Sequence, residues 1–110
     1  MKLPGLENAV ISSEKITGYL LSPTHPNGRH KALFFTRFGF SIDTWEEFAD
    51  ALRQHAGDHY VAKVENSPFG TRYVIDGEIL SPDRRNPLIR SVWFRTGNAT
   101  NPYFVTAYPL

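Results

Sequence analysis

The sequence contains no cysteine and no run of apolar residues long enough to cross a membrane. The absence of cysteine excludes disulfides, thiolate nucleophiles and cysteine-bound zinc, and it fits a reducing compartment. A transmembrane helix would need about 20 predominantly apolar residues. We therefore expect a cytoplasmic protein that does not engage a membrane.

Signatures of cofactor-dependent chemistry are also missing. The sequence has no HExxH metal motif, no P-loop, no GxGxxG turn and no GxSxG nucleophile elbow. Four acidic residues near the middle of the chain are expected on the outward side of a helix, where they would not form a paired acid and base. We expect neither a metal nor a cofactor.

The charge balance argues against duplex DNA as a partner. Residues 1–60 contain six Lys or Arg and seven Asp or Glu, whereas residues 61–110 contain six and four. An excess of two positive charges is weak beside the basic patches of DNA-binding proteins. Apolar residues make up 41% of the chain and aromatic residues 14%, which suffices for a core. At this length we expect a single domain over residues 1–110.

The first half of the chain has helical periodicity. Helices are predicted over about residues 13–21, 29–38 and 43–56, with a Pro- and Gly-rich loop at residues 22–28. Serine caps the first helix, and a glycine follows each of the other two. Their predicted buried faces are Ile16, Tyr19 and Leu20; Leu33, Phe34 and Phe38; and Trp45, Phe48, Ala49, Leu52 and Ala56.

From His59 onward the period changes to two. Strands are predicted at residues 59–65, 71–80, 88–95 and 103–109, joined by turn-rich segments. We therefore predict an α+β fold in which the N-terminal helices, about residues 12–56, pack on one face of a four-stranded antiparallel meander, about residues 59–108. Alternation places three sets of side chains each on a shared face: Arg72, Val74 and Asp76; Ser91, Trp93 and Arg95; and Phe104, Thr106 and Tyr108.

The segment "GRHKALFF" concentrates cationic groups at a predicted helix start. On one interpretation Arg29 and Lys31 hold a phosphate, favoured by backbone N–H groups and the helix dipole, while His30 transfers a proton. Gly28 would allow the backbone to come close. On the other interpretation this is a surface helix start with His30 packed against Phe34.

Two further candidates lie on the strands. Thr106 and Tyr108 place two hydroxyls on one strand face, where they could contact a phosphate or a 2′-OH, although both are also good strand formers. A basic series is interleaved with Tyr73 and Trp93, and it suits the stacking of unpaired bases in single-stranded RNA. The alternative for this series is a solvated surface. Its members are Arg72, Arg84, Arg85, Arg90 and Arg95.

Across nearly its whole length the chain resembles a family of short bacterial proteins described as a domain of unknown function. The segments that carry the resemblance include "GFSIDTWEEFADALRQHA", "GTRYVIDGEILSPD", "RSVWF" and "VTAYPL". The element order, the early His-Lys pair and the closing Thr-x-Tyr-Pro strand are also loosely similar to the small RNase toxins of the barnase, EndoU, colicin and RelE-like group.

The second resemblance implies cleavage of RNA without a metal, through attack of the 2′-OH on the adjacent phosphate. It makes His30 the general base, Lys31 a stabiliser of the phosphorane charge, and Thr106 and Tyr108 contacts to the phosphate or 2′-OH. Arg90 or Arg95 would add positive charge. The chain lacks a clear second histidine on a strand, although His59 lies where one begins.

These observations lead to two hypotheses of different classes. The first is a metal-independent ribonuclease toxin with RNA as substrate and a small antitoxin or immunity-type protein as partner. The second is a non-catalytic protein-binding module, such as an antitoxin, an immunity protein or an adaptor. Catalysis requires His30, Lys31, Thr106 and Tyr108 to meet in one concave site.

Overall fold

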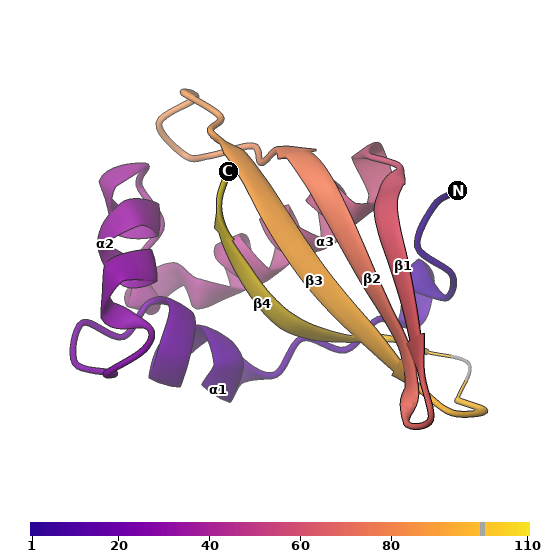
Figure 1. The fold of residues 1–110 in the computed structure, drawn as a ribbon. Helices are drawn as coiled ribbons and strands as arrows, with labels where there is room; N and C mark the ends of the chain where they lie inside the picture. The colour runs from indigo at the N-terminus through magenta and orange to yellow at the C-terminus, as the bar shows by residue number, and fades with distance from the viewer. Residues whose placement is uncertain (100) are drawn as a thin grey trace.

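The computed structural model describes residues 1–99 and 101–110. Four strands form one antiparallel sheet in the order β1-β2-β3-β4, which confirms the predicted meander (Figure 1). Short connections join consecutive strands, as the turn-rich segments predict. The strands are β1 Val61–Ser67, β2 Gly70–Glu78, β3 Leu88–Thr96 and β4 Tyr103–Pro109.

The helices precede the sheet in the chain, as predicted. Helix α3 lies behind the sheet, whereas α1 and α2 lie on the side of β4 (Figure 1). None of the helices in the described part of the chain has the length and hydrophobicity needed to cross a bilayer. The helices are η1 Leu6–Asn8, α1 Ser13–Lys15, the π-helical η2 Ile16–Leu20, α2 Arg29–Arg37, η3 Ile42–Thr44 and α3 Trp45–Asp58.

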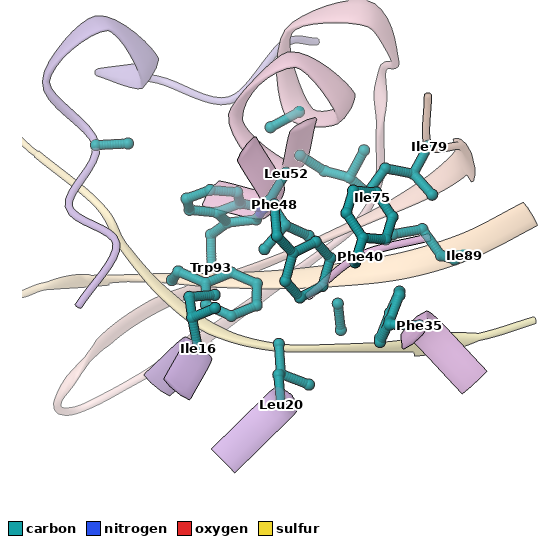
Figure 2. Close-up of a cluster of buried hydrophobic side chains, with 14 of the residues drawn as sticks. Ile16, Leu20, Phe35, Phe40, Phe48, Leu52, Ile75, Ile79, Ile89 and Trp93 are labelled. Atoms are coloured by element: carbon teal, nitrogen blue, oxygen red, sulfur yellow. The ribbon is translucent and has the colours of Figure 1, made fainter. Parts of the chain in front are cut away.

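One hydrophobic core fills the space between the helices and the sheet (Figure 2). It brings together η2, α2, α3 and the inner face of β2, β3 and β4. Phe35, Phe40 and Phe48 form a cluster of tilted and edge-on rings, with the ring centroids of Phe40 and Phe48 4.5 Å apart. On the sheet side, the Trp93 ring meets Phe104 edge to face at 5.3 Å. Both the helical layer and the sheet therefore contribute aromatic rings to the core.

The buried helix faces differ in part from those predicted. In α2, Ala32 and Phe35 are buried, whereas Leu33 is 60% exposed. In α3, Trp45 is only half-buried, whereas His55, which is not in the predicted buried face, is buried. The reason is geometric: both helices are rotated toward the residues that contact the sheet, and spacing alone does not give that rotation.

A β-bulge changes the facing of β4. Thr106 pairs with Val92 but Phe104 pairs with Trp93, which leaves Val105 as an extra residue. The prediction that Phe104 and Thr106 share a face is therefore wrong, because Phe104 enters the core while the side chain of Thr106 lies on the other face. Without the bulge, the hydroxyl of Thr106 would face the core.

A directional chain of hydrogen bonds crosses the core. The Trp93 Nε1–H donates to Ser91 Oγ at 3.0 Å, and Ser91 Oγ lies 3.0 Å from His55 Nδ1. His55 Nε2 lies 3.1 Å from the carbonyl oxygen of Gly77, which can only accept. The imidazole therefore carries its proton on Nε2, and Nδ1 accepts from the Ser91 hydroxyl. Within the described residues, no fully buried side-chain nitrogen or oxygen lacks a hydrogen-bond partner.

Acidification is expected to destabilise the fold through His55. Burial lowers the pKa of its imidazole from 6.5 to about 4, with the nearby His59 acting in the same direction. Below pH 6.5 the unfolded chain binds a proton that the folded chain does not. The free energy of unfolding should therefore fall by up to about 3 kcal/mol between pH 7 and pH 4, measured by urea denaturation.

A His55→Gln variant serves as the control, because glutamine can donate to the Gly77 carbonyl but does not titrate. The carboxylates of Glu65 and Asp83, whose pKa values lie below the ordinary range, contribute to both proteins alike, whereas the lowered pKa of Asp76 depends mainly on Arg90 and last on His55. At pH 7 the variant should have a smaller free energy of unfolding than the wild type. This free energy should also fall less in the variant between pH 7 and pH 4. An equal loss in both proteins would contradict the role of His55.

Candidate functional site

The site lies where η2, the start of α2 and the edge strand β4 meet. Gly28 immediately precedes α2, and a Cβ at this position would overlap the carbonyl oxygen of Tyr19. Only glycine allows this approach of the two backbones, a role different from the approach to a phosphate that the sequence suggested. The wide π-helical turn of η2 places Tyr19 next to Lys31 of α2.

Three polar side chains converge at this junction. Lys31 Nζ donates to the Tyr19 hydroxyl and, at 3.3 Å, to Thr106 Oγ1. The Tyr19 and Thr106 oxygens lie 3.4 Å apart. All three residues are half-buried. Residues distant in sequence thus form one compact group that we call the Lys31 cluster: Lys31, Tyr19 and Thr106.

The electrostatics of the Lys31 cluster act on the Tyr19 phenol. Partial burial opposes ionisation, but hydrogen bonds from Lys31 and Thr106 and the charges of Lys31 and Lys15 outweigh it, so the pKa of Tyr19 lies below 10. The ammonium of Lys31 lies 4.9 Å from the centre of the Tyr19 ring and 5.7 Å from that of Tyr108. One cation is therefore flanked by two phenols.

Tyr108 connects the Lys31 cluster to a second cation. It pairs with Arg90 across β3 and β4. Asp76 holds the Arg90 guanidinium through two hydrogen bonds of 2.7 and 2.9 Å. The hydrogen bond to Asp76 contributes most to raising the pKa of Arg90, and the one to Tyr108 comes second. The same bond from Arg90 lowers the pKa of Asp76. The guanidinium is thus locked in place beside the phenol.

A groove of about 820 Å³ lies beside the Lys31 cluster and shares Tyr19 with it. Its lining combines one acidic and one basic side chain with several rings: Glu14, Lys15, Tyr19, His25, Tyr103 and Phe104. The His25 ring meets Tyr19 edge-on at 5.0 Å. The Nδ1 of His25 accepts from the backbone N–H of Asn27 at 3.0 Å and of Gly28 at 3.1 Å. Its proton is therefore on Nε2, which makes His25 a fixed donor.

The structure brings together only part of the predicted catalytic set. Lys31, Thr106 and Tyr108 converge with Arg90 beside them, whereas His30 is exposed. Successive helix positions differ by about 100°, so Lys31 points toward β4 when His30 points to solvent. Arg29 is exposed on the same outward side of α2 as His30. The packing of His30 against Phe34 is not observed either.

The other predicted RNA-contacting residues lie apart from the Lys31 cluster. Trp93 is fully buried in the core, where its ring is inaccessible to a base. Arg95 lies on the same face of β3 as Trp93 and borders a separate hollow beside Pro4 and Gly5. Arg72 lies on β2 and forms an ion pair with Glu65 of β1. These side chains therefore do not form one binding surface.

Sequence reasoning missed two members of the site. Spacing assigns Tyr19 to a buried helical face, because the π-helical turn that turns its hydroxyl toward Lys31 leaves no mark in the pattern of apolar residues. His25 falls in a segment predicted only as a loop. The signal that could have found it is its position just before Asn-Gly, where a side-chain acceptor can satisfy free N–H groups before a helix.

His55 of α3 and His59, just after the helix, have the four-residue spacing found in helical metal sites, which the expectation of no metal overlooked. Their rings lie 4.9 Å apart. However, both nitrogens of His55 are engaged in the core, and His59 Nε2 bonds the Glu78 carbonyl at 2.8 Å. Among the described residues no group of three or more His, Asp or Glu side chains is arranged to hold a metal ion.

The fold defines a small α+β protein in which helices flank the edge of an antiparallel meander. The chain belongs to the family described as Domain of unknown function (DUF6883), which it matches over residues 2–110. This confirms the first resemblance in the sequence. A comparison with curated proteins finds no match.

A solved structure shares this fold at low sequence identity. It is the "Contact-dependent growth inhibition toxin - immunity protein complex from Klebsiella pneumoniae 342". The matching chain is 18% identical, with a TM-score of 0.72, and the alignment covers 96% of each chain. At this identity the similarity establishes the fold alone.

Replacing Lys31 with methionine is expected to raise the pKa of Tyr19. The substitution removes the hydrogen bond and the charge that stabilise the phenolate but keeps an unbranched apolar stem. The pKa can be followed through the Cζ chemical shift of isotopically labelled tyrosine, assigned with a Tyr19→Phe variant. Lys63→Met, on the exposed strand β1, is the matched control and should leave the value unchanged. An unchanged Tyr19 pKa in Lys31→Met would contradict the electrostatic account of the cluster.

Proposed function

We propose that this chain is a metal-independent ribonuclease of the toxin type that acts on RNA in the cytoplasm. The observation that carries the proposal is the convergence of Lys31, Tyr19, Thr106 and Tyr108 beside a groove that Tyr19 also lines. Such a site offers a half-buried cation and hydroxyls for a phosphate, together with two phenols able to exchange protons. The aromatic rings of the groove also suit single-stranded RNA.

The roles of the residues follow from their environments. Tyr19, in the phenolate form that Lys31 favours, accepts the proton of the attacking 2′-OH. Lys31, close to both phenols, neutralises the negative charge that develops on the phosphate, while Thr106 donates to a phosphate oxygen. Tyr108, which pairs with Arg90, protonates the leaving oxygen. This division replaces His30 as the base suggested by the sequence.

The reaction balances in protons and bonds. A bond forms between the 2′-oxygen and phosphorus as the bond from phosphorus to the 5′-oxygen breaks, which gives a 2′,3′-cyclic phosphate and a free 5′-hydroxyl. Tyr19 gains one proton and Tyr108 loses one, and solvent restores both. Attacking and leaving oxygens lie roughly in line in such displacements, so base and acid must be separate groups, and two phenols near one ammonium supply them.

The similar fold in a toxin and immunity protein complex supports a toxin or immunity role. It also favours the second candidate, a non-catalytic module that holds a protein partner, because that complex pairs a toxin with an immunity protein. A near-neutral net charge of +1 is compatible with that candidate. The polar convergence at the groove favours the enzyme, since a protein interface does not require a cation flanked by two phenols.

Loss of Lys31 should abolish most RNA cleavage. We expect Lys31→Met and Tyr19→Phe each to slow cleavage by about 100-fold or more in the presence of a chelator, the usual loss when an acid, base or charge-stabilising group is removed. Induced expression of the wild type should arrest bacterial growth, and total RNA should be fragmented. Lys63→Met should behave like the wild type. Harmless expression with intact RNA from every protein would favour the non-catalytic candidate.

The assignment of acid and base can be tested with an activated leaving group. A nucleoside 3′-phosphodiester with a nitrophenyl leaving group needs no proton on departure, so Tyr108→Phe should recover most of its activity on it relative to RNA. Tyr19→Phe should stay impaired on both substrates, because the 2′-OH must still lose its proton. The opposite pattern would exchange the two roles, and equal impairment of both variants would refute the division.

A further inference from the structure

A second cationic surface lies outside the Lys31 cluster. Helix α2 carries three Lys or Arg residues, one histidine and no acidic residue. Arg29, His30 and Arg37 are exposed, and at about 100° per residue they fall within an arc of about 100° on the outward side of the helix. Lys31, on the inward side, belongs to the cluster. The outward face therefore begins beside the proposed active site and runs about 12 Å along the helix.

The β2–β3 loop continues this surface beyond the end of α2, at the upper left of Figure 1. Arg85 donates to the carbonyl oxygen of Arg37 at 2.7 Å, and its guanidinium lies 4.4 Å from the centre of the Phe38 ring. The Asp83 N–H donates to the Phe38 carbonyl at 3.3 Å. The loop is thus docked on the helix. We name the combined surface the basic stripe: Arg29, His30, Arg37, Arg84 and Arg85.

The loop is rigid and holds Arg84 in an unfavourable backbone conformation. Ser81 and Asn86 exchange hydrogen bonds of 2.9 and 3.0 Å, and Asp83 accepts from Ser81 and Arg85. Arg84 has φ of 66°, in the left-handed region that glycine or asparagine would occupy more readily. An exposed arginine kept under such strain points to a use for its side chain.

The composition of the basic stripe favours a phosphate backbone over a protein partner. Its exposed apolar neighbours are Leu33 on α2 and Leu80 in the β2–β3 loop, two aliphatic side chains from different elements, whereas protein interfaces have an apolar or aromatic centre. Among its described neighbours on α2, the rings of Phe34 and Phe38 are half-buried, so bases would find no open stacking platform. The carboxylate of Asp83 forms an ion pair with Arg85. The acidic residues Glu47 and Asp50 line a different hollow together with Ser81.

We propose that the basic stripe binds the phosphate backbone of a base-paired segment, so that the substrate is a folded RNA whose adjoining single strand enters the groove. This inference rests on the proposed function, which supplies RNA as the ligand. Base pairing hides the bases and presents phosphates, which is what a surface of arginines without open aromatic rings can contact. The stripe would thereby select RNA by shape before cleavage.

The test measures binding, with cleavage prevented. The probe is a labelled RNA hairpin with a single-stranded overhang that carries 2′-deoxy sugars, and the overhang alone is the comparison. The stripe variant combines Arg37→Gln with Arg84→Asn, which suits the left-handed backbone. The matched control combines Lys2→Gln with Lys63→Gln and removes the same charge from other surfaces. Thermal melting checks that all proteins remain folded.

We expect the stripe variant to bind the hairpin about tenfold more weakly than the wild type, with a slope of log affinity against log salt that is smaller by about 1 to 2. The control pair should keep both values, and the overhang alone should bind all three proteins equally. Equal weakening by both pairs, or an undiminished affinity of the stripe variant, would overturn the proposal.

A wild-type protein that binds the hairpin no more tightly than the overhang would also overturn it and leave the basic stripe to an acidic protein. Failure of the proposed function is recognised separately, by incubating the wild type with the all-ribose hairpin. Binding through the stripe without cleavage would refute the ribonuclease and retain the stripe. Cleavage without a contribution of the stripe to binding would refute the role of the stripe and retain the ribonuclease.

Discussion

The close backbone contact between Gly28 and Tyr19 determines where the functional groups of this protein can lie. It brings the start of α2 against η2 at a distance that no side chain would allow. The helix then directs Lys31 inward to Tyr19, and its position beside the edge of the sheet brings the same ammonium to Thr106. Removing this contact would separate the two halves of the Lys31 cluster even if the core were intact.

The bulge in β4 acts together with that contact. By inserting Val105 opposite the step from Val92 to Trp93, it allows Phe104 to fill the core and Thr106 to face α2. The core and the site therefore use neighbouring residues of one strand without competing for the same space. The chain of hydrogen bonds through His55 and Ser91 then holds α3 on the inner face of the sheet, away from the polar edge.

The sequence predicted the elements well because their signals are local. Strand positions follow from alternation and turns, and the convergence of Lys31, Thr106 and Tyr108 follows from the side on which α2 packs. Other features depend on tertiary structure that spacing does not carry. The π-helical turn directs the hydroxyl of Tyr19 toward Lys31, and the bulge places Thr106 on the face of β4 opposite to Phe104. The rotation of α2 leaves His30 in solvent, and Trp93 is buried in the core.

The Lys31 cluster is assembled from the two ends of the described chain, since Tyr19 and Thr106 are 87 residues apart. Its helical members, Tyr19 and Lys31, precede the α3–β1 junction, and its strand member, Thr106, follows it. Each half of the polypeptide thus carries an incomplete set of groups, and the halves are complementary. A gene divided at that junction would encode two fragments, and neither fragment would contain a complete site. Only association of the two fragments would restore the cluster, as in a split reporter protein.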